Sequence, residues 1–236
     1  MFLYLDQNYV SRITKFRLGQ KDHDDFGRLH QLILEKGIIV PPSPFHVLEI
    51  HTSYLKPTLV QVFEELSQGY WVRPWQEILD IQKKSPECHI QDLLSQQGSW
   101  EHPAELSLLT SITSWHLEGS IFKRTRAAKA SLCELLEVSE DDGDLPFLET
   151  LSRLLAFRSL NQARQPHDSD LADLVIAATI RPYFSWIGTD RFVRECLDRL
   201  GLGEGVFSAR RREVERFCSL IQESQSVGDE DKGSGG

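Results

Sequence analysis

Short apolar runs alternate along this chain with longer segments whose apolar residues recur every three or four positions. A short apolar run bounded by charged residues, glycine or proline is typical of a buried strand, whereas the longer spacing is typical of an amphipathic helix. We predict strands at 2–5, 38–40, 70–72 and 184–188. We predict helices at 9–18, 24–36, 44–55, 58–68, 168–181, 190–200 and 209–223, and a mostly helical stretch from about 75 to 165.

Residues with special backbone preferences mark several of these boundaries. Pro41 and Pro42 stop the strand at 38–40, because proline cannot donate to a strand ladder. Ser43 can cap a helix that has Pro44 at its first position. The glycines at 201, 203 and 205 follow a helix rather than a strand. We therefore interpret them as a flexible turn and not as a phosphate-binding loop.

The order of the predicted elements indicates the fold class. Strands that alternate with helices favour an α/β protein with three layers and a parallel sheet. We expect a single domain over 1–223, a large helical insertion at about 56–165, and a disordered tail at 224–236, which is polar and rich in glycine.

Composition and charge exclude several classes of protein. The chain has 236 residues and a formal net charge of −9, with no apolar run of the length that a membrane span needs. The N-terminus lacks the basic segment and long apolar core of a signal peptide. We therefore expect a cytoplasmic protein without a membrane partner. The four cysteines form no CxxC pair, so we expect free thiols rather than a zinc site.

Positive charge is gathered in two places despite the negative total. Phosphate groups respond to local potential, so the net charge does not exclude a nucleic-acid partner. An alternative is that both groups are solvated helix faces. The candidate nucleic-acid-binding residues are Lys123, Arg124, Arg126 and Lys129 in one group, and Arg210, Arg211 and Arg212 in the other.

Acidic residues occur where the predicted elements place active sites in parallel sheets. Asp6 directly follows the first strand, and Asp190 follows the strand at 184–188. Glu49 lies on the helix after the second strand, and Asp173 lies in the helix at 168–181. Ligands in such folds bind beyond the carboxyl ends of the strands, so these side chains can converge.

Each acid also has a structural interpretation. Asp6 and Asp190 can be N-caps of the helices that follow them, and Glu49 can lie on a solvated helix face. Crowded carboxylates, however, repel each other, and hard divalent cations such as Mg²⁺ or Mn²⁺ relieve that repulsion. A metal site made of carboxylates is typical of phosphodiester hydrolysis. His46 and His51 are five positions apart and make a poor zinc pair.

These segments resemble the PIN-domain nucleases. The resemblance rests on the segments FLYLDQNYV at 2–10, PSPFHVLEI at 42–50, DLADLVIAAT at 170–179 and WIGTDRF at 186–192. It implies a PIN-like fold and metal-dependent endonuclease activity on RNA, less often on DNA. It also implies that Asp6, Glu49, Asp173 and Asp190 form the catalytic quartet that binds Mg²⁺ or Mn²⁺. Asn8 and Thr189 match positions that orient the site, and Asp170 is an accessory candidate.

The long helical insertion departs from the small toxin ribonucleases of this family. It can grip a substrate or a partner protein, and its tryptophans, mostly expected in the core, are candidate stacking platforms. A nuclease endangers its host, so a regulatory protein partner is a further hypothesis, as is a homodimer. Two alternatives stay open: a related NYN-type nuclease, and an inactive or effector-controlled PIN-like module that serves as a protein-interaction scaffold.

Overall fold

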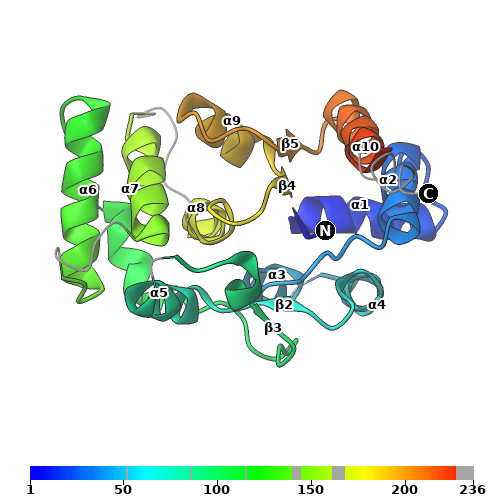
Figure 1. The fold of residues 1–236 in the computed structure, drawn as a ribbon, viewed down its shortest axis with the longest axis horizontal. Helices are drawn as coiled ribbons and strands as arrows, with labels where there is room; N and C mark the ends of the chain where they lie inside the picture. The colour runs from blue at the N-terminus through cyan, green and yellow to red at the C-terminus, as the bar shows by residue number, and fades with distance from the viewer. Residues whose placement is uncertain (52, 86, 115, 140–144, 161–167, 227–236) are drawn as a thin grey trace, which may run out of the picture.

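A parallel sheet of three strands forms the centre of the computed structural model, which describes residues 1–51, 53–85, 87–114, 116–139, 145–160 and 168–226. The strand order is β1-β4-β5, with bounds Leu3–Leu5, Trp186–Thr189 and Val206–Ser208 (Figure 1). Leu5 pairs with Gly188, and Thr189 pairs with Ser208. All three strands therefore end at the same edge of the sheet, as the α/β prediction requires.

Side chains on the two faces of the sheet belong to two separate hydrophobic clusters. Leu3 and Leu5 pack in one cluster, whereas Tyr4 between them packs in the other, because successive strand residues point to opposite faces. The first cluster includes residues of α1 (Gln7–Arg17), α2 (Asp24–Glu35), α4 (Lys56–Ser67) and α10 (Arg211–Ser226). The second includes residues of α5 (Trp75–Lys84), α6 (Ile121–Leu135), α7 (Pro146–Arg158), α8 (Asp168–Ile180) and α9 (Arg191–Arg199).

The short helix α3 (Pro44–Ile50) contributes to both clusters. Phe45 packs in the second cluster and Ile50 packs in the first. This position places the helix beside the sheet, where its remaining side chains can reach the strand ends.

Strand β5 was not among the predicted elements. Its three residues lie directly after the glycine turn, and the strand exists because it pairs with β4, a contact that local sequence does not encode. The turn makes this pairing close. Gly205 has φ +68°, and a Cβ there would lie 1.9 Å from the carbonyl oxygen of Ser185.

We expect Gly205→Ala to lower the free energy of unfolding by about 3 kcal/mol or more, because a positive φ and a backbone clash both oppose the side chain. Gly201→Ala is the matched control. Gly201 also has a positive φ, of +70°, but nothing lies within 4 Å of its Cβ position. Its cost is therefore expected to be about 1 kcal/mol. Urea denaturation measures both, and equal losses would contradict the steric argument.

Three predicted boundaries are wrong. The segment 38–40 forms one parallel bridge, Ile39 with Phe2, rather than a named strand. The helix predicted to reach 55 ends at Ile50, and the Ser53 hydroxyl accepts from the Leu55 N–H at 3.2 Å in the following turn, a local bond that competes with helix continuation. Helix α10 continues to Ser226, so 224–226 belongs to a helix, while 227–236 lies outside the described residues.

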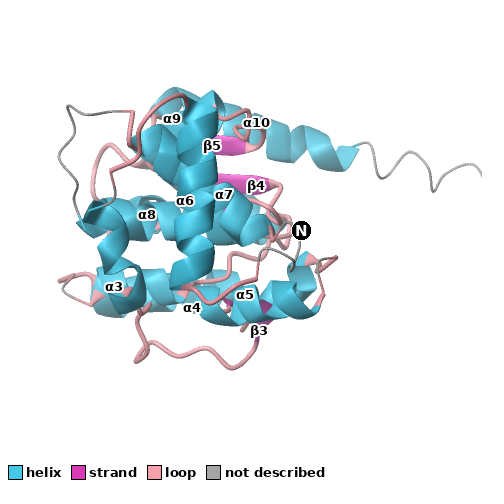
Figure 2. Ribbon diagram, turned by 90° about the vertical axis from the view of Figure 1, so that its left-hand side faces the viewer, coloured by secondary structure: helices cyan, strands magenta, loops and turns pink. Residues whose placement is uncertain are grey.

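Helices α5, α6 and α7 of the predicted insertion lie at one end of the molecule, whereas its helix α4 packs on α1 toward the other end (Figure 1). Helices α6 and α7 lie side by side, with α7 between α6 and α8 (Figure 1). The insertion also contains two short strands that pair with each other, β2 (Trp71–Val72) and β3 (Leu94–Ser95), and the 3-10 helices Ile90–Leu93 and Ser107–Ser114. Figure 2 shows β4 and β5 among the helices, with α10 extending away from them.

Within the described part of the chain, none of the helices combines the length and the apolar character that crossing a membrane requires.

Candidate metal centre

Asp6 and Asp190 lie at the ends of neighbouring strands, and each caps a helix. The Asp6 backbone N–H donates to the Gly188 carbonyl at 2.8 Å, which holds the end of β1 against β4. The Asp6 carboxylate accepts from the Asn8 N–H at 2.5 Å, at the start of α1. The Asp190 carboxylate accepts from the Val193 N–H at 2.7 Å, at the start of α9. The capping interpretation is therefore confirmed for both residues, and capping leaves both carboxylates at the strand ends.

A buried histidine places Glu49 beside these strand ends. His46 lies one turn before Glu49 on α3, and its Nε2 donates to the Leu5 carbonyl at 2.9 Å. Its Nδ1 accepts from the Ser43 N–H at 2.9 Å, so this nitrogen carries no proton and the imidazole is neutral. The ring thus joins α3 to the last residue of β1, next to Asp6.

A small cavity collects three of the four predicted acids. Its volume is about 20 Å³, enough for one water-sized particle. Asp173 reaches it from α8, and Thr189 reaches it from the end of β4. The polar residues around it are Tyr4, Asp6, Gln7, His46, Glu49, Asp173 and Thr189. Asp190 lies outside this lining, but its charge acts on both Asp6 and Glu49.

Burial, together with neighbouring negative charge, raises the pKa values of Asp6 and Glu49. Burial raises the pKa of Asp6 from 3.8 to about 7, and the charge of Asp190 adds to this shift, although hydrogen bonds from Asn8 and Asp190 oppose it. The pKa of Glu49 rises from 4.5 to about 8, first through desolvation by surrounding protein atoms and then through the charges of Asp6, Asp173 and Asp190. The Glu49 residue as a whole retains an exposed face. Asp6 and Glu49 therefore keep part of their protons near neutral pH, and their full negative charge develops only at higher pH.

The donor chemistry of the site suits a hard divalent cation. Oxygen ligands are what Mg²⁺ and Mn²⁺ prefer, and the mutual repulsion of the carboxylates is what a cation relieves. Among the described residues, no group of three or more His, Cys, Asp or Glu side chains is already arranged to hold a metal ion. Side-chain adjustment would therefore have to accompany binding. The four cysteines are free thiols, as predicted.

The accessory candidates separate into two kinds. Asn8 is exposed and contacts Asp6 through its backbone and its side chain, and Thr189 is buried at the cavity. Asp170 is absent from the cavity lining. Its carboxylate is 1% exposed and pairs with Arg158 at 3.2 Å. This buried ion pair joins α7 to α8, so Asp170 supports the helix that carries Asp173.

Sequence reasoning missed the supporting residues of the site, Tyr4 and His46 above all. The Tyr4 hydroxyl lies 3.3 Å from the Ser43 hydroxyl. Burial, followed by the charges of the nearby carboxylates, raises the Tyr4 pKa well above 10. The sequence presents His46 only as a poor zinc ligand, five positions from His51. The signal that could have found it is its position at the third residue of a helix capped by Ser43, where the ring can bond back to the cap.

His46→Gln is expected to destabilise the protein at pH 7 by about 1–3 kcal/mol, because buried bonds to Leu5 and Ser43 are lost. Desolvation lowers the His46 pKa from 6.5 to about 4. The unfolded chain therefore binds the extra proton first as the pH falls, and the contribution of His46 is lost between about pH 6.5 and pH 4. The difference between wild type and variant should narrow over this range. Urea unfolding at pH 7 and pH 4.5 measures it, and a constant difference would contradict a buried neutral ring.

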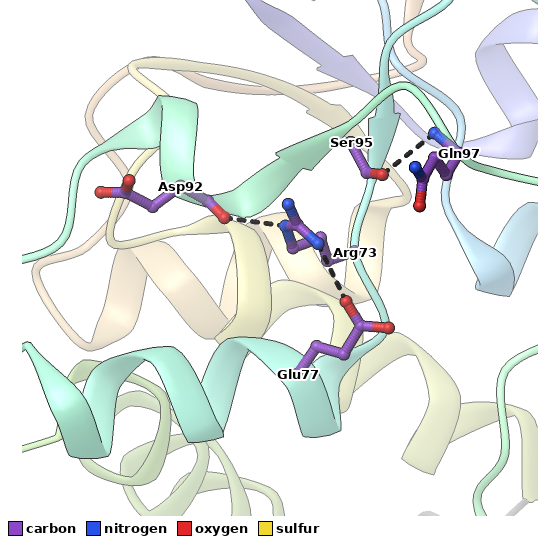
Figure 3. A network of polar contacts seen from close by, with 5 residues as sticks. All are labelled: Arg73, Glu77, Asp92, Ser95 and Gln97. Atoms are coloured by element: carbon purple, nitrogen blue, oxygen red, sulfur yellow. Dashed lines mark hydrogen bonds and ion pairs between the residues drawn. The ribbon is translucent and has the colours of Figure 1, made fainter.

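A larger cavity lies at the other end of α3. It has a volume of about 540 Å³ and is lined mainly by the β2–β3 region and the start of α5. Its cation, Arg73, is already engaged: Arg73 donates to Glu77 at 3.1 Å and to the Asp92 carbonyl at 3.0 Å (Figure 3). Glu105 adds another negative charge to the lining. Because Arg73 is already paired and Glu105 adds negative charge, this cavity disfavours a phosphate ligand.

The tryptophans of the insertion are mainly structural. Trp75 is buried and stacks on Phe147, and its indole N–H donates to the Glu105 carbonyl at 2.9 Å. Trp71 and Trp100 contact each other with ring centres 4.7 Å apart. The core interpretation is thus confirmed for Trp75, while Trp115 lies outside the described residues.

Comparisons with known proteins identify no relative of this chain: no family model, no curated protein and no solved structure matches it.

Proposed function

We propose that this chain is a metal-dependent endonuclease of the PIN-like type that hydrolyses phosphodiester bonds, of RNA in preference to DNA. One observation carries the proposal. The carboxylate of Glu49 interacts with those of Asp6, Asp173 and Asp190 beside the carboxyl edge of a parallel sheet. Four separate elements supply these acids, in the order along the chain that the PIN resemblance implies.

The chain's own residues perform two tasks in this proposal. Asp6, Glu49, Asp173 and Asp190 would hold Mg²⁺ or Mn²⁺, which when bound supplies positive charge to polarise the phosphate and an attacking water. Asp6 and Glu49, with pKa values near 7 and 8, hold protons in part at neutral pH and release them when a cation competes. His46 and Tyr4 support the strand end and the helix that position these carboxylates.

The proposal is tested with purified protein, labelled single-stranded RNA and DNA of matched sequence, and Mn²⁺, Mg²⁺ or EDTA. We expect cleavage with either metal, faster for RNA, and none with EDTA. Cleavage that persists in EDTA would contradict the metal requirement. No cleavage of either strand with either metal, together with no heat of Mn²⁺ binding in calorimetry, would favour the inactive scaffold instead.

A further inference from the structure

The two basic groups predicted from the sequence occupy different parts of the fold. Because Thr189 pairs with Ser208, Ala209 lies opposite Asp190 where β4 and β5 end, and Arg210 follows it. Adjacent strands are about 4.8 Å apart. The arginine run at 210–212 therefore begins at the same sheet edge as the acidic site, and this relation depends on the pairing of β5 with β4.

Three arginines that follow the ends of β4 and β5 along the chain are exposed. They are Arg191, Arg210 and Arg212, which we call the edge arginines, and no contact with a carboxylate of the described residues involves them. Arg211 differs, because it pairs with Asp25 and Glu215 at 3.2 Å each.

The segment that carries Arg210 is held in place by α1. Arg12 donates to the Ala209 carbonyl at 3.0 Å, and its guanidinium lies 5.1 Å from the centre of the Phe26 ring. Arg12 therefore fixes the backbone next to Arg210 instead of offering a fully free cation.

A hollow beside Asp190 adds a place for a base. It has a volume of about 640 Å³ and lies between the end of α7 and the start of α9. Asp190, Arg191, Phe192 and Glu195 line it from the α9 side, and Phe157 and Leu160 line it from the α7 side, so the cation that it offers is Arg191 beside two acids. Aromatic rings next to a cation are what single-stranded nucleic acids use, because an unpaired base can stack on the ring while its phosphate meets the charge.

The basic residues of α6, which we call the α6 group, are less suited to this task; they are Lys123, Arg124, Arg126 and Lys129. Arg124 is engaged with the carbonyls of Ser159 and Gly119, at 3.0 and 2.8 Å, and Lys129 lies 3.6 Å from Glu149. Helix α7 separates α6 from α8, the helix that carries Asp173 (Figure 1). A nucleic-acid strand bound to α6 would therefore be separated from the acids by α7.

We propose that a single-stranded nucleic acid binds along this sheet edge, with its phosphates on the edge arginines and one base in the hollow against Phe192. The inference rests on the proposed nuclease function and adds the substrate class and its path. The α6 group takes no part in this path.

Binding is measured in the Asp173→Asn background, so that cleavage does not interfere, with a labelled single-stranded RNA and a duplex of the same sequence. Arg210→Ala/Arg212→Ala is compared with Lys123→Ala/Arg126→Ala. Each pair removes two exposed positive charges, so the change in net charge is matched. We expect the edge pair to weaken binding about tenfold and to reduce the slope of log K against log salt by about 1.4, or about 0.7 per phosphate contact.

The α6 pair is expected to change affinity by less than about twofold, and Phe192→Ala is expected to weaken binding of the single strand about tenfold through lost stacking. Thermal unfolding of each variant shows that it is folded. Three results would each overturn the inference. They are an equal loss of RNA affinity in Arg210→Ala/Arg212→Ala and Lys123→Ala/Arg126→Ala, tighter binding of the duplex than of the single strand, and no RNA binding by the Asp173→Asn protein itself.

The two proposals fail separately. If the wild-type protein cleaves RNA and Arg210→Ala/Arg212→Ala leaves kcat/KM unchanged, the path is wrong while the nuclease function stands. If RNA binding depends on the edge arginines but the wild-type protein cleaves nothing with Mn²⁺ or Mg²⁺, the nuclease function is wrong while the path stands.

Discussion

Asp173→Asn is expected to reduce metal-dependent cleavage of RNA by about 10³-fold or more, equivalent to about 4 kcal/mol of transition-state stabilisation. Asp173 reaches the small cavity from α8, next to Asp6 and Glu49. The amide has nearly the same shape but lacks the charge that holds a divalent cation. Single-turnover cleavage with saturating Mn²⁺ measures the effect.

Asp80→Asn is the matched control for this prediction. Asp80 is an exposed residue of α5 and does not line the acidic cavity, so the same chemical change should leave the rate within about twofold. Comparable rates for Asp173→Asn and wild type, with both proteins folded, would remove Asp173 from the proposed site.

Asp6→Asn is expected to stabilise the metal-free protein at pH 8, although it removes a residue of the proposed active site. The pKa of Asp6 rises from 3.8 in the unfolded chain to about 7 in the folded chain. The folded protein therefore holds more protons between these values, and its stability falls as the pH rises through them. Asparagine carries no charge and still caps α1. Discounted for partial exposure, the gain is about 1–2 kcal/mol, or about 2–8 °C in Tm.

With divalent metal bound, we expect wild type to become more stable than Asp6→Asn. A cation that binds only the folded state stabilises it by about 2.7 kcal/mol at a hundred times its Kd, and proton competition makes the effect larger at pH 8 than at pH 6. Thermal unfolding of wild type and Asp6→Asn, with EDTA and with Mn²⁺, measures both effects. An Mn²⁺-induced shift of equal size in the two proteins would contradict a role for Asp6 in holding the metal.

Most local elements could be predicted because their signals are local. The helix at 168–181 is observed as Asp168–Ile180, and the helix at 24–36 as Asp24–Glu35, since apolar spacing and end residues act within a few positions. Strand β5 could not be predicted from local signals, because its three residues form a strand only by pairing with β4. The segment at 38–40 shows the reverse error: it has strand composition but makes only one bridge, through Ile39.

The candidate site also combines residues that local sequence selects with relations that only tertiary packing decides. Strand-end position and acidic character were enough to select Asp6 and Asp190, and the structure brings Glu49 and Asp173 to them from α3 and α8. Asp170 has the same local character as Asp173, one turn away, yet it is buried against Arg158. Only the packing of α7 on α8 distinguishes the two carboxylates.

The sequence by itself determined the parallel α/β class and most helices, and it selected the four candidate acids, because hydrophobic periodicity, capping and the chemistry of carboxylates are properties of neighbouring residues. The tertiary structure alone decided which groups share an environment. Desolvation and neighbouring charge raise the pKa values of Asp6 and Glu49, and β5 brings Arg210 to the edge where β1 and β4 end. These depend on contacts between distant segments, and such contacts exist only once the chain has folded.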